Sequence, residues 1–168
     1  QVRVARLFGG ASVGEHDLIQ KALAPKGLAV GFWKVALRPG KPLMFGHLGK
    51  QPVLGLPGNP VSALVCALVF VRAAVGAMLG QPYDDGTIAA TLGRDLEAND
   101  QRQDYLRGAL DRRDDGILVA TPFDRQDSSM LASLAAAGCL LVRAPHAPAA
   151  RAGDPVRIIP FGLGPAAY

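Results

Sequence analysis

One stretch, LPGNPVSALV at residues 56–65, constrains the fold of this chain more than any other. The apolar residues ahead of it predict a strand, and Pro57 and Gly58 predict a tight loop directly after that strand. Asn59 is a favoured N-cap residue, and Pro60 suits the first position of a helix. A strand, a loop and a helix therefore follow one another. The helix N-terminus lies beside the loop, which is a common way to bind an anion.

A similar arrangement occurs earlier in the chain. GGASVG, at residues 9–14, predicts a loop, and apolar residues at helical spacing predict a helix after it that ends near Gly27. Two prolines and a glycine make RPGKP, at residues 38–42, a turn with little backbone freedom. The strands expected in this part of the chain cover residues 31–37, 43–48 and 53–56, with a turn at Gly49 and Lys50 between the last two. These elements predict an α/β segment.

The pattern changes after residue 81. The β-like runs that follow cover residues 87–92, 105–110, 117–121, 139–143 and 156–159, and a short helix is expected at 129–136. We therefore divide the chain into an α/β segment, residues 1–81, and a small β-rich domain, residues 82–168. The helix expected at residues 60–79 is nearly all apolar, but Arg72 and many small residues favour a helix of a soluble core over a membrane span.

Composition narrows the class of protein. Hydrophobic residues make up 49% of the chain and charged residues 19%, which is typical of a folded globular protein. The net charge is +4, but the Lys and Arg residues are scattered, which argues against nucleic-acid binding. Cys66 and Cys139 both lie among apolar neighbours, so we expect buried, reduced thiols in a cytoplasmic protein.

Three cations, Lys34, Arg38 and Lys41, lie on and after one predicted strand. Lys34 and Arg38 are four residues apart, so on an extended strand they would share a face, and the turn would carry Lys41 back toward them. Ordinary surface charge is the alternative interpretation. Between two loops that can hold anions, these cations predict a site for a phosphorylated ligand.

Two acids, Glu15 and Asp17, follow the first glycine-rich loop. Asp17 is the better candidate for a Mg²⁺ ligand beside phosphate oxygens, and capping of the following helix is the structural alternative for both acids. The histidines have no partners at metal-ligand spacing, which argues against a zinc site. Ser12 and Ser62 lack a recognisable base, which argues against a serine hydrolase.

The order and spacing of three stretches resemble one protein family. GGASVGEHD, WKVALRPGKP and LPGNPVSALV are together similar to the molybdopterin molybdenumtransferase family, known as MoeA in bacteria and as the E domain of gephyrin in animals. RQDYLR at residues 102–107, QDSS at 126–129 and AGDPVRIIPF at 152–161 resemble the C-terminal β-barrel domain of that family. The resemblance implies an α/β fold. Residues 1–81 would be the C-terminal half of a doubly wound molybdopterin-binding domain, followed by a small β-barrel-like domain.

The resemblance also implies a function. Members of the family insert molybdate into adenylated molybdopterin and release AMP, with help from a divalent cation. It thus implies a transferase of molybdenum cofactor biosynthesis that uses Mg²⁺ and is a homodimer when full length. Asp17 would support the cleavage and bind the metal, and Lys41 and Arg38 would be catalytic cations. Arg38 stands where the family usually has Lys, which keeps the charge but changes its geometry.

Further positions match the family's substrate-binding residues. In the first domain these are Gly9, Gly10, Ser12, Gly14, Lys34, Pro42, Pro57, Gly58, Asn59, Pro60 and Ser62. From the barrel domain, Arg102 or Arg107, with Ser128 or Ser129, would form a molybdate site. Both sets would hold tetrahedral oxyanions through hydroxyl groups, cations and backbone N–H groups.

Proteins of this family are longer than the present chain, and Arg3 and Arg6 are unsuited to the buried strand expected before the glycines. We therefore expect a truncated or mis-started fragment that is weakly active or inactive alone. Two other functions stay open. One is a non-catalytic scaffold that binds molybdopterin or anchors peptides, and the other is an unrelated α/β domain that binds a nucleotide or sugar phosphate.

Overall fold

The chain divides into two units, Gln1–Tyr83 and Asp84–Tyr168. The computed structural model describes residues 5–8, 18–127 and 131–162. The domain boundary predicted from the sequence follows residue 81, whereas the structure divides the chain after Tyr83. The Gln81–Pro82 segment that suggested a boundary lies just inside the N-terminal unit.

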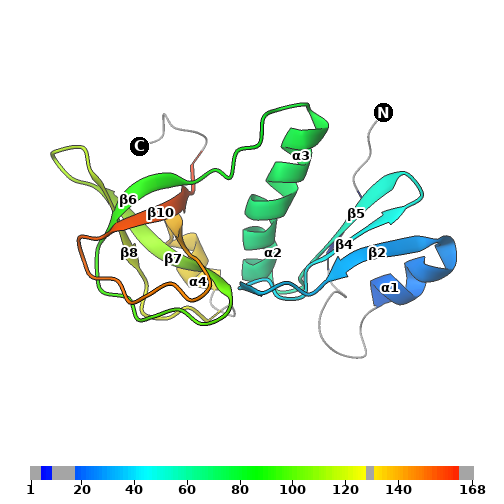
Figure 1. Ribbon diagram of the computed structural model, residues 1–168, viewed down its shortest axis with the longest axis horizontal. Coiled ribbons are helices and arrows are strands. Elements are labelled where there is room, and N and C mark those ends of the chain that lie inside the picture. Colours follow the sequence, from blue (N-terminus) through cyan, green and yellow to red (C-terminus); the bar gives the residue numbers. More distant parts are fainter. Residues whose placement is uncertain (1–4, 9–17, 128–130, 163–168) are drawn as a thin grey trace. The chain divides into compact units, whose positions relative to one another are not determined.

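A four-stranded mixed sheet forms the N-terminal unit (Figure 1). In the order in which they pair, its strands are β1 (Ala5–Phe8), β5 (Gln51–Leu56), β4 (Met44–Leu48) and β2 (Leu28–Trp33). β1 runs parallel to β5, and the other neighbours are antiparallel. Gly49, with a φ of 59°, turns β4 back into β5 at the predicted place. Among the described strands, β1 and β2 form the edges of this sheet.

The helix predicted after the first glycine-rich loop is present as α1 (Leu18–Leu23). It continues into a short 3-10 turn (Ala24–Lys26), which ends at Gly27 with a φ of 90°. Only glycine adopts such a φ at little cost, so the predicted stop near Gly27 is confirmed.

The predicted strand at residues 31–37 is wrong in its bounds. β2 ends at Trp33, because Lys34 takes a φ of 68° and so leaves the extended conformation. Leu37–Arg38 form a separate two-residue strand, β3. The argument that Lys34 and Arg38 share one face of a continuous strand is therefore also wrong.

A long apolar helix follows β5. It consists of α2 (Pro60–Cys66), a π-helical segment (Ala67–Val71) and α3 (Arg72–Met78). α2 lies against β5 and buries Val61, Val65 and Cys66. By length and composition the whole helix could also cross a membrane, and only 28% of it is buried. The prediction of a helix buried in a soluble core thus holds for its first two turns only.

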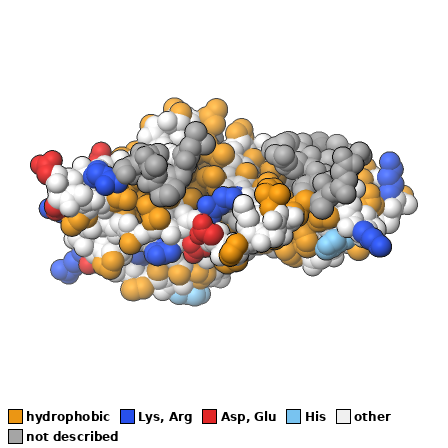
Figure 2. Space-filling model, turned by 90° about the horizontal axis from the view of Figure 1, so that it is seen from above, with side chains coloured by type: hydrophobic (Ala, Val, Ile, Leu, Met, Phe, Trp, Pro, Cys, Tyr) orange, Lys and Arg blue, Asp and Glu red, His pale blue; other side chains and the backbone are white. Residues whose placement is uncertain are grey.

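An apolar groove, which we call the sheet–helix groove, lies between the strands and this helix. It has a volume of about 230 Å³. Its lining residues are Phe32, Phe45, Pro52 and Leu54 from the strands, and Phe70, Val71, Ala74, Val75 and Met78 from the helix. Hydrophobic side chains also occupy much of the face seen in Figure 2. Among the described residues, the N-terminal unit therefore has a sizeable apolar groove.

Five strands close into a barrel in the C-terminal unit (Figure 1). They are β6 (Ile88–Leu92), β7 (Gln103–Arg112), β8 (Leu118–Pro122), β9 (Cys139–Arg143) and β10 (Pro155–Pro160), with α4 (Leu131–Ala135) before β9. The pairing order is β7-β8-β6-β10-β9, and β9 pairs again with β7. The predicted short strands and the predicted short helix are thus all present, within a few residues of their expected bounds.

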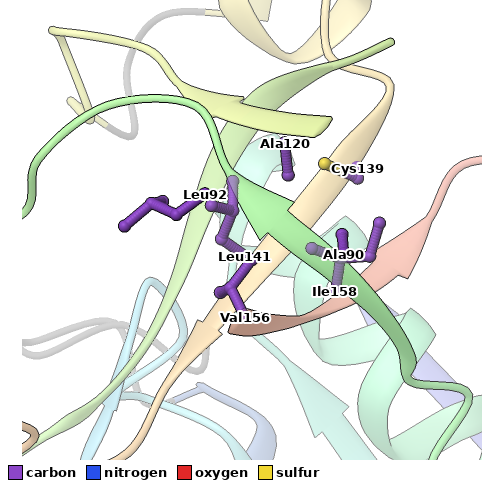
Figure 3. Packing of buried hydrophobic residues seen from close by; sticks show 7 residues of the cluster. All are labelled: Ala90, Leu92, Ala120, Cys139, Leu141, Val156 and Ile158. Atoms are coloured by element: carbon purple, nitrogen blue, oxygen red, sulfur yellow. The ribbon is translucent and has the colours of Figure 1, made fainter. Parts of the chain in front are cut away.

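The barrel encloses a compact hydrophobic core (Figure 3). Its buried members are Ala90, Leu92, Ala120, Cys139, Leu141, Val156 and Ile158. Those on one strand are two residues apart, as required when successive side chains of a strand point to opposite faces. Cys139 belongs to this core and Cys66 to the packing of α2, so both cysteines are buried and unbridged, as predicted.

Candidate functional site

The RPGKP turn, residues 38–42, is held by backbone hydrogen bonds to the residues before it. The amide of Val35 donates to the Lys41 carbonyl over 2.9 Å, and the amide of Lys34 donates to the Leu43 carbonyl over 3.0 Å. Arg38 and Lys41 are exposed on this closed turn. The turn therefore presents two cations on a backbone with few alternative conformations.

Lys34 lies at the base of the same turn, although not through the strand geometry expected from the sequence. Its Nζ sits 4.1 Å from the centroid of the Trp33 ring, a cation–π contact. A positive φ in a residue other than glycine is uncommon and tends to occur where function or packing demands it. The structure thus brings Lys34 and Lys41 onto neighbouring, hydrogen-bonded segments.

The LPGNP stretch forms the predicted cap of α2. The Asn59 side chain accepts a hydrogen bond from the Ser62 amide over 3.1 Å, and Pro60 occupies the first helical turn. Pro57 and Ser62 are buried, whereas Gly58 and Pro60 are exposed. The cap uses the Ser62 amide, the Ala63 amide donates to the Asn59 carbonyl, and Pro60 has no N–H. This helix end therefore has few donors left for an anion.

The RPGKP turn contacts the last residue of α2. The Cys66 Sγ lies 3.8 Å from the carbonyl oxygen of Gly40 in the RPGKP turn. Burial raises the pKa of the Cys66 thiol to about 12, so this thiol is neutral at neutral pH. Cys66 was not among the site residues predicted from the sequence. Its apolar neighbours in the sequence indicate burial but do not reveal what it packs against.

The two barrel arginines predicted as molybdate ligands differ sharply in environment. Arg102 is about one-third exposed and forms an ion pair with Asp100 at 2.8 Å. Arg107 is only 1% exposed, and its Nη1 donates to the Asp127 carbonyl over 2.9 Å. Burial lowers the pKa of Arg107, while Asp127 opposes that shift. Arg107 therefore also has a structural part in the barrel, which the sequence analysis did not predict.

Gln126, in the barrel unit, was not among the site residues predicted from the sequence. Its amide oxygen accepts from the backbone amide of Arg107, and its amide nitrogen donates to the carbonyls of Arg107 and Phe123, each over 2.9 Å. The side chain thus pairs with β7 as a further backbone segment would. Gln126 fastens the segment after β8 to the barrel wall.

Several predicted site residues lie outside the described part of the chain. These are Gly9, Gly10, Ser12, Gly14, Asp17, Ser128 and Ser129. Within the described residues, no three His, Cys, Asp or Glu side chains are grouped so that they could hold a metal ion. The magnesium prediction therefore rests on Asp17 alone and stays a prediction.

Two known protein families together match most of the chain. Residues 89–161 match the family described as the MoeA C-terminal region (domain IV). Residues 4–77 match the family described as a probable molybdopterin binding domain. The chain belongs to the MoeA family. It corresponds to the C-terminal part of MoeA proteins, as the resemblance of its motifs predicts.

Individual MoeA relatives agree with this assignment. The chain is 34% identical over 155 residues to the molybdopterin molybdenumtransferase of Haemophilus influenzae, covering 91% of this chain and 38% of that protein. It is 32% identical over 135 residues to the Bacillus subtilis molybdopterin molybdenumtransferase, covering 80% of this chain and 31% of that protein. The chain thus spans between 31% and 38% of the length of these two relatives.

Solved structures of MoeA proteins share the fold. The molybdopterin biosynthesis moea protein from Pyrococcus horikosii matches with a TM-score of 0.71 and 24% identity, over 97% of this chain and 38% of that one. A molybdenum cofactor biosynthesis protein from Pyrococcus furiosus matches with a TM-score of 0.66 and 22% identity, over 88% of this chain and 55% of that one. The predicted α/β fold followed by a β-barrel is therefore confirmed.

Proposed function

We propose that this chain is the part of a molybdopterin molybdenumtransferase that holds the substrate's phosphate and the incoming molybdate. The whole enzyme would insert molybdate into adenylated molybdopterin and release AMP. The RPGKP turn carries this proposal, because it exposes Arg38 and Lys41 on a closed backbone within a domain of a family whose named members are such transferases.

Charge neutralisation is what this chemistry requires from the protein. Cleavage of the adenylate releases AMP, and negative charge builds up on the phosphate oxygens as the bond breaks. Lys41 and Arg38 would stabilise that charge, and the guanidinium of Arg38 can bind two oxygens of one oxyanion at once. Lys34, beside the same turn, adds a third positive charge. A turn with little freedom keeps these cations in place without reorganisation during the reaction.

A magnesium ion is part of the proposal, with Asp17 as its protein ligand. Mg²⁺ is commonly held by one or two carboxylates together with phosphate oxygens of the substrate. Such a site needs no cluster of three protein ligands. When bound, the ion would neutralise phosphate charge.

The proposal also includes the cellular location, the class of ligand and the oligomeric state of the protein. Two buried free thiols, Cys66 and Cys139, support a cytoplasmic location. On the face shown in Figure 2, Lys and Arg side chains lie in separate small groups, which supports small anions as ligands rather than nucleic acid. We further propose a homodimer for the full-length protein and no membrane partner. The chain by itself would turn over weakly or not at all.

Release of AMP tests this function. The measurement uses adenylated molybdopterin, molybdate and Mg²⁺, with a full-length protein that contains this chain and with the chain alone. We expect Lys41→Ala in the full-length protein to lower the rate by about 100-fold, the effect typical of losing one charge-stabilising donor. We expect Asp17→Ala to lower it at least as much, because the metal would be lost as well.

Lys50→Ala is the matched control. Lys50 is an exposed lysine of the same unit, in the turn between β4 and β5, and should leave the rate unchanged. Equal rates of AMP release for Lys41→Ala and Lys50→Ala would mean that Lys41 has no role in the reaction. A full-length protein that binds the pterin but releases no AMP would instead indicate a non-catalytic scaffold.

A further inference from the structure

The RPGKP turn packs against α2 at Gly40, where there is no space for a side chain. An ideal Cβ built on Gly40 would lie 2.7 Å from the Cys66 Sγ and 2.5 Å from the Leu37 Cδ2. Cys66 is 0% exposed, and its Sγ is 3.8 Å from the Gly40 carbonyl oxygen. The backbone of the turn is therefore in direct contact with the side chain at position 66.

The backbone conformation at this contact has few alternatives. Gly40 has a φ of 128°, in the region that favours glycine. The amide of Leu43 donates to the Gly40 carbonyl over 3.1 Å, so the same carbonyl oxygen that faces Cys66 also closes the turn. A larger side chain at position 66 must therefore move the turn or strain it, and a smaller one leaves a cavity beside the turn, because interiors are close-packed.

Lys41 follows Gly40 directly and is exposed, while Gly40 is buried. A shift of Gly40 therefore shifts the attachment point of the Lys41 side chain. We propose that Cys66 is a positioning residue: its side-chain volume sets the place of the RPGKP turn on α2, and through it the place of Lys41. The inference rests on the proposed oxyanion-binding function of Lys41, and it adds a residue that touches no ligand.

The other buried cysteine provides a matched control. Cys139 is also 0% exposed, its Sγ also lies 3.8 Å from a backbone carbonyl, that of Gly108, and burial raises its pKa to about 12 as well. The two thiols differ in what they support, since Cys139 belongs to the barrel core and Cys66 contacts the RPGKP turn. Truncation of either thiol removes a similar contact, but only the change at Cys66 should affect the turn.

The experiment uses the 168-residue chain with two readouts. Backbone amide resonances of Gly40 and Lys41 report the place of the turn, and calorimetric titration with inorganic phosphate reports oxyanion binding. We expect Cys66→Leu to shift both resonances and to weaken phosphate binding by about tenfold, since small misplacements of a charged group lose much of its interaction. Cys66→Ala should have a smaller effect, and Cys66→Ser, which has the same shape and is only slightly smaller, should retain both properties. Cys139→Ala should change neither readout.

Each result is decisive. Unmoved Gly40 and Lys41 resonances in folded Cys66→Leu would overturn the proposal, as would equal shifts in Cys139→Ala. If the turn moves and phosphate binding stays unchanged while Lys41→Ala weakens it, the link from Cys66 to Lys41 is wrong. If Lys41→Ala itself leaves phosphate binding unchanged, the proposed function of Lys41 fails, and the resonances alone then decide whether Cys66 positions the turn.

Discussion

The two units of this chain differ in whether their sheets are closed or open. In the C-terminal unit five strands close on themselves, and alternate side chains fill the interior. In the N-terminal unit the described sheet is open, its edge strand β2 is largely exposed, and an apolar groove remains beside the helix. Closure removes edge strands, whereas an open sheet needs a cover for its edges and faces.

This difference bears on the stability of the two units. The barrel gains stability from a complete core. The N-terminal unit carries the exposed cations and the RPGKP turn, but much of its long helix is not buried. We infer that packing within the barrel is the more stable part of this chain, and that the N-terminal unit opens more readily.

The largest expected effect comes from the same substitution at a buried leucine of the barrel and at an exposed leucine of the long helix. Leu141→Ala, at a barrel position with 0% exposure, should lower the free energy of unfolding by about 2–5 kcal/mol, because it removes buried methyl groups and leaves a cavity. Leu64→Ala, at a helix position with 39% exposure, should cost less than about 1 kcal/mol. Urea unfolding followed by circular dichroism measures both. Equal losses would contradict the contrast between the units.

A second, smaller effect concerns the polar part of the barrel. Gln126→Ala removes the side chain that bonds to the Arg107 backbone and leaves those buried groups without this partner. We expect a loss of about 1–3 kcal/mol in the same urea assay. Arg102→Ala, which removes a partly exposed ion pair, should cost within about 1 kcal/mol. If Arg102→Ala cost more, the Gln126 contacts would not be a main support of the barrel.

Local sequence signals predicted much of this fold. Asn59 and Pro60 mark the start of α2, Gly27 ends the first helical segment and Gly49 turns a hairpin, because each residue type has a strong backbone preference of its own. The break of β2 at Lys34 was not predictable in this way. Lysine has no preference for a positive φ, so the backbone hydrogen bonds of the RPGKP turn must impose it.

The candidate site was predictable only in part for a similar reason. Charged side chains such as Lys41 stand out in a sequence, and the family resemblance gives them a role. Cys66 and Gln126 act through contacts with residues 26 and 19 positions away, and no local pattern encodes such contacts. Arg107 was predicted as a ligand, but its charge alone does not show that its side chain is buried.

Thiol labelling compares the stability of the two units directly. Both thiols have a pKa raised to about 12, so at pH 8 the native state holds almost no thiolate, and labelling must pass through opened forms. We expect Cys66 to be labelled about tenfold faster than Cys139, which corresponds to about 1.4 kcal/mol between the two opening reactions. Mass spectrometry of digested, alkylated protein measures both rates in one sample. Faster labelling of Cys139 would reverse the order of stability inferred for the units.

The smallest expected effect concerns the sheet–helix groove. Val75 lines this groove and is 40% exposed, so Val75→Asp would place a charge on its apolar surface at little cost to the fold. We expect binding of a fluorescent hydrophobic dye to fall about twofold, since the groove is an exposed apolar patch of the chain. Ala77→Asp is the matched control, because it places the same charge on an exposed position of α3 that does not line the groove. If both variants lower dye binding equally, the dye binds elsewhere, and the open face of the N-terminal unit differs less from the closed barrel than its structure implies.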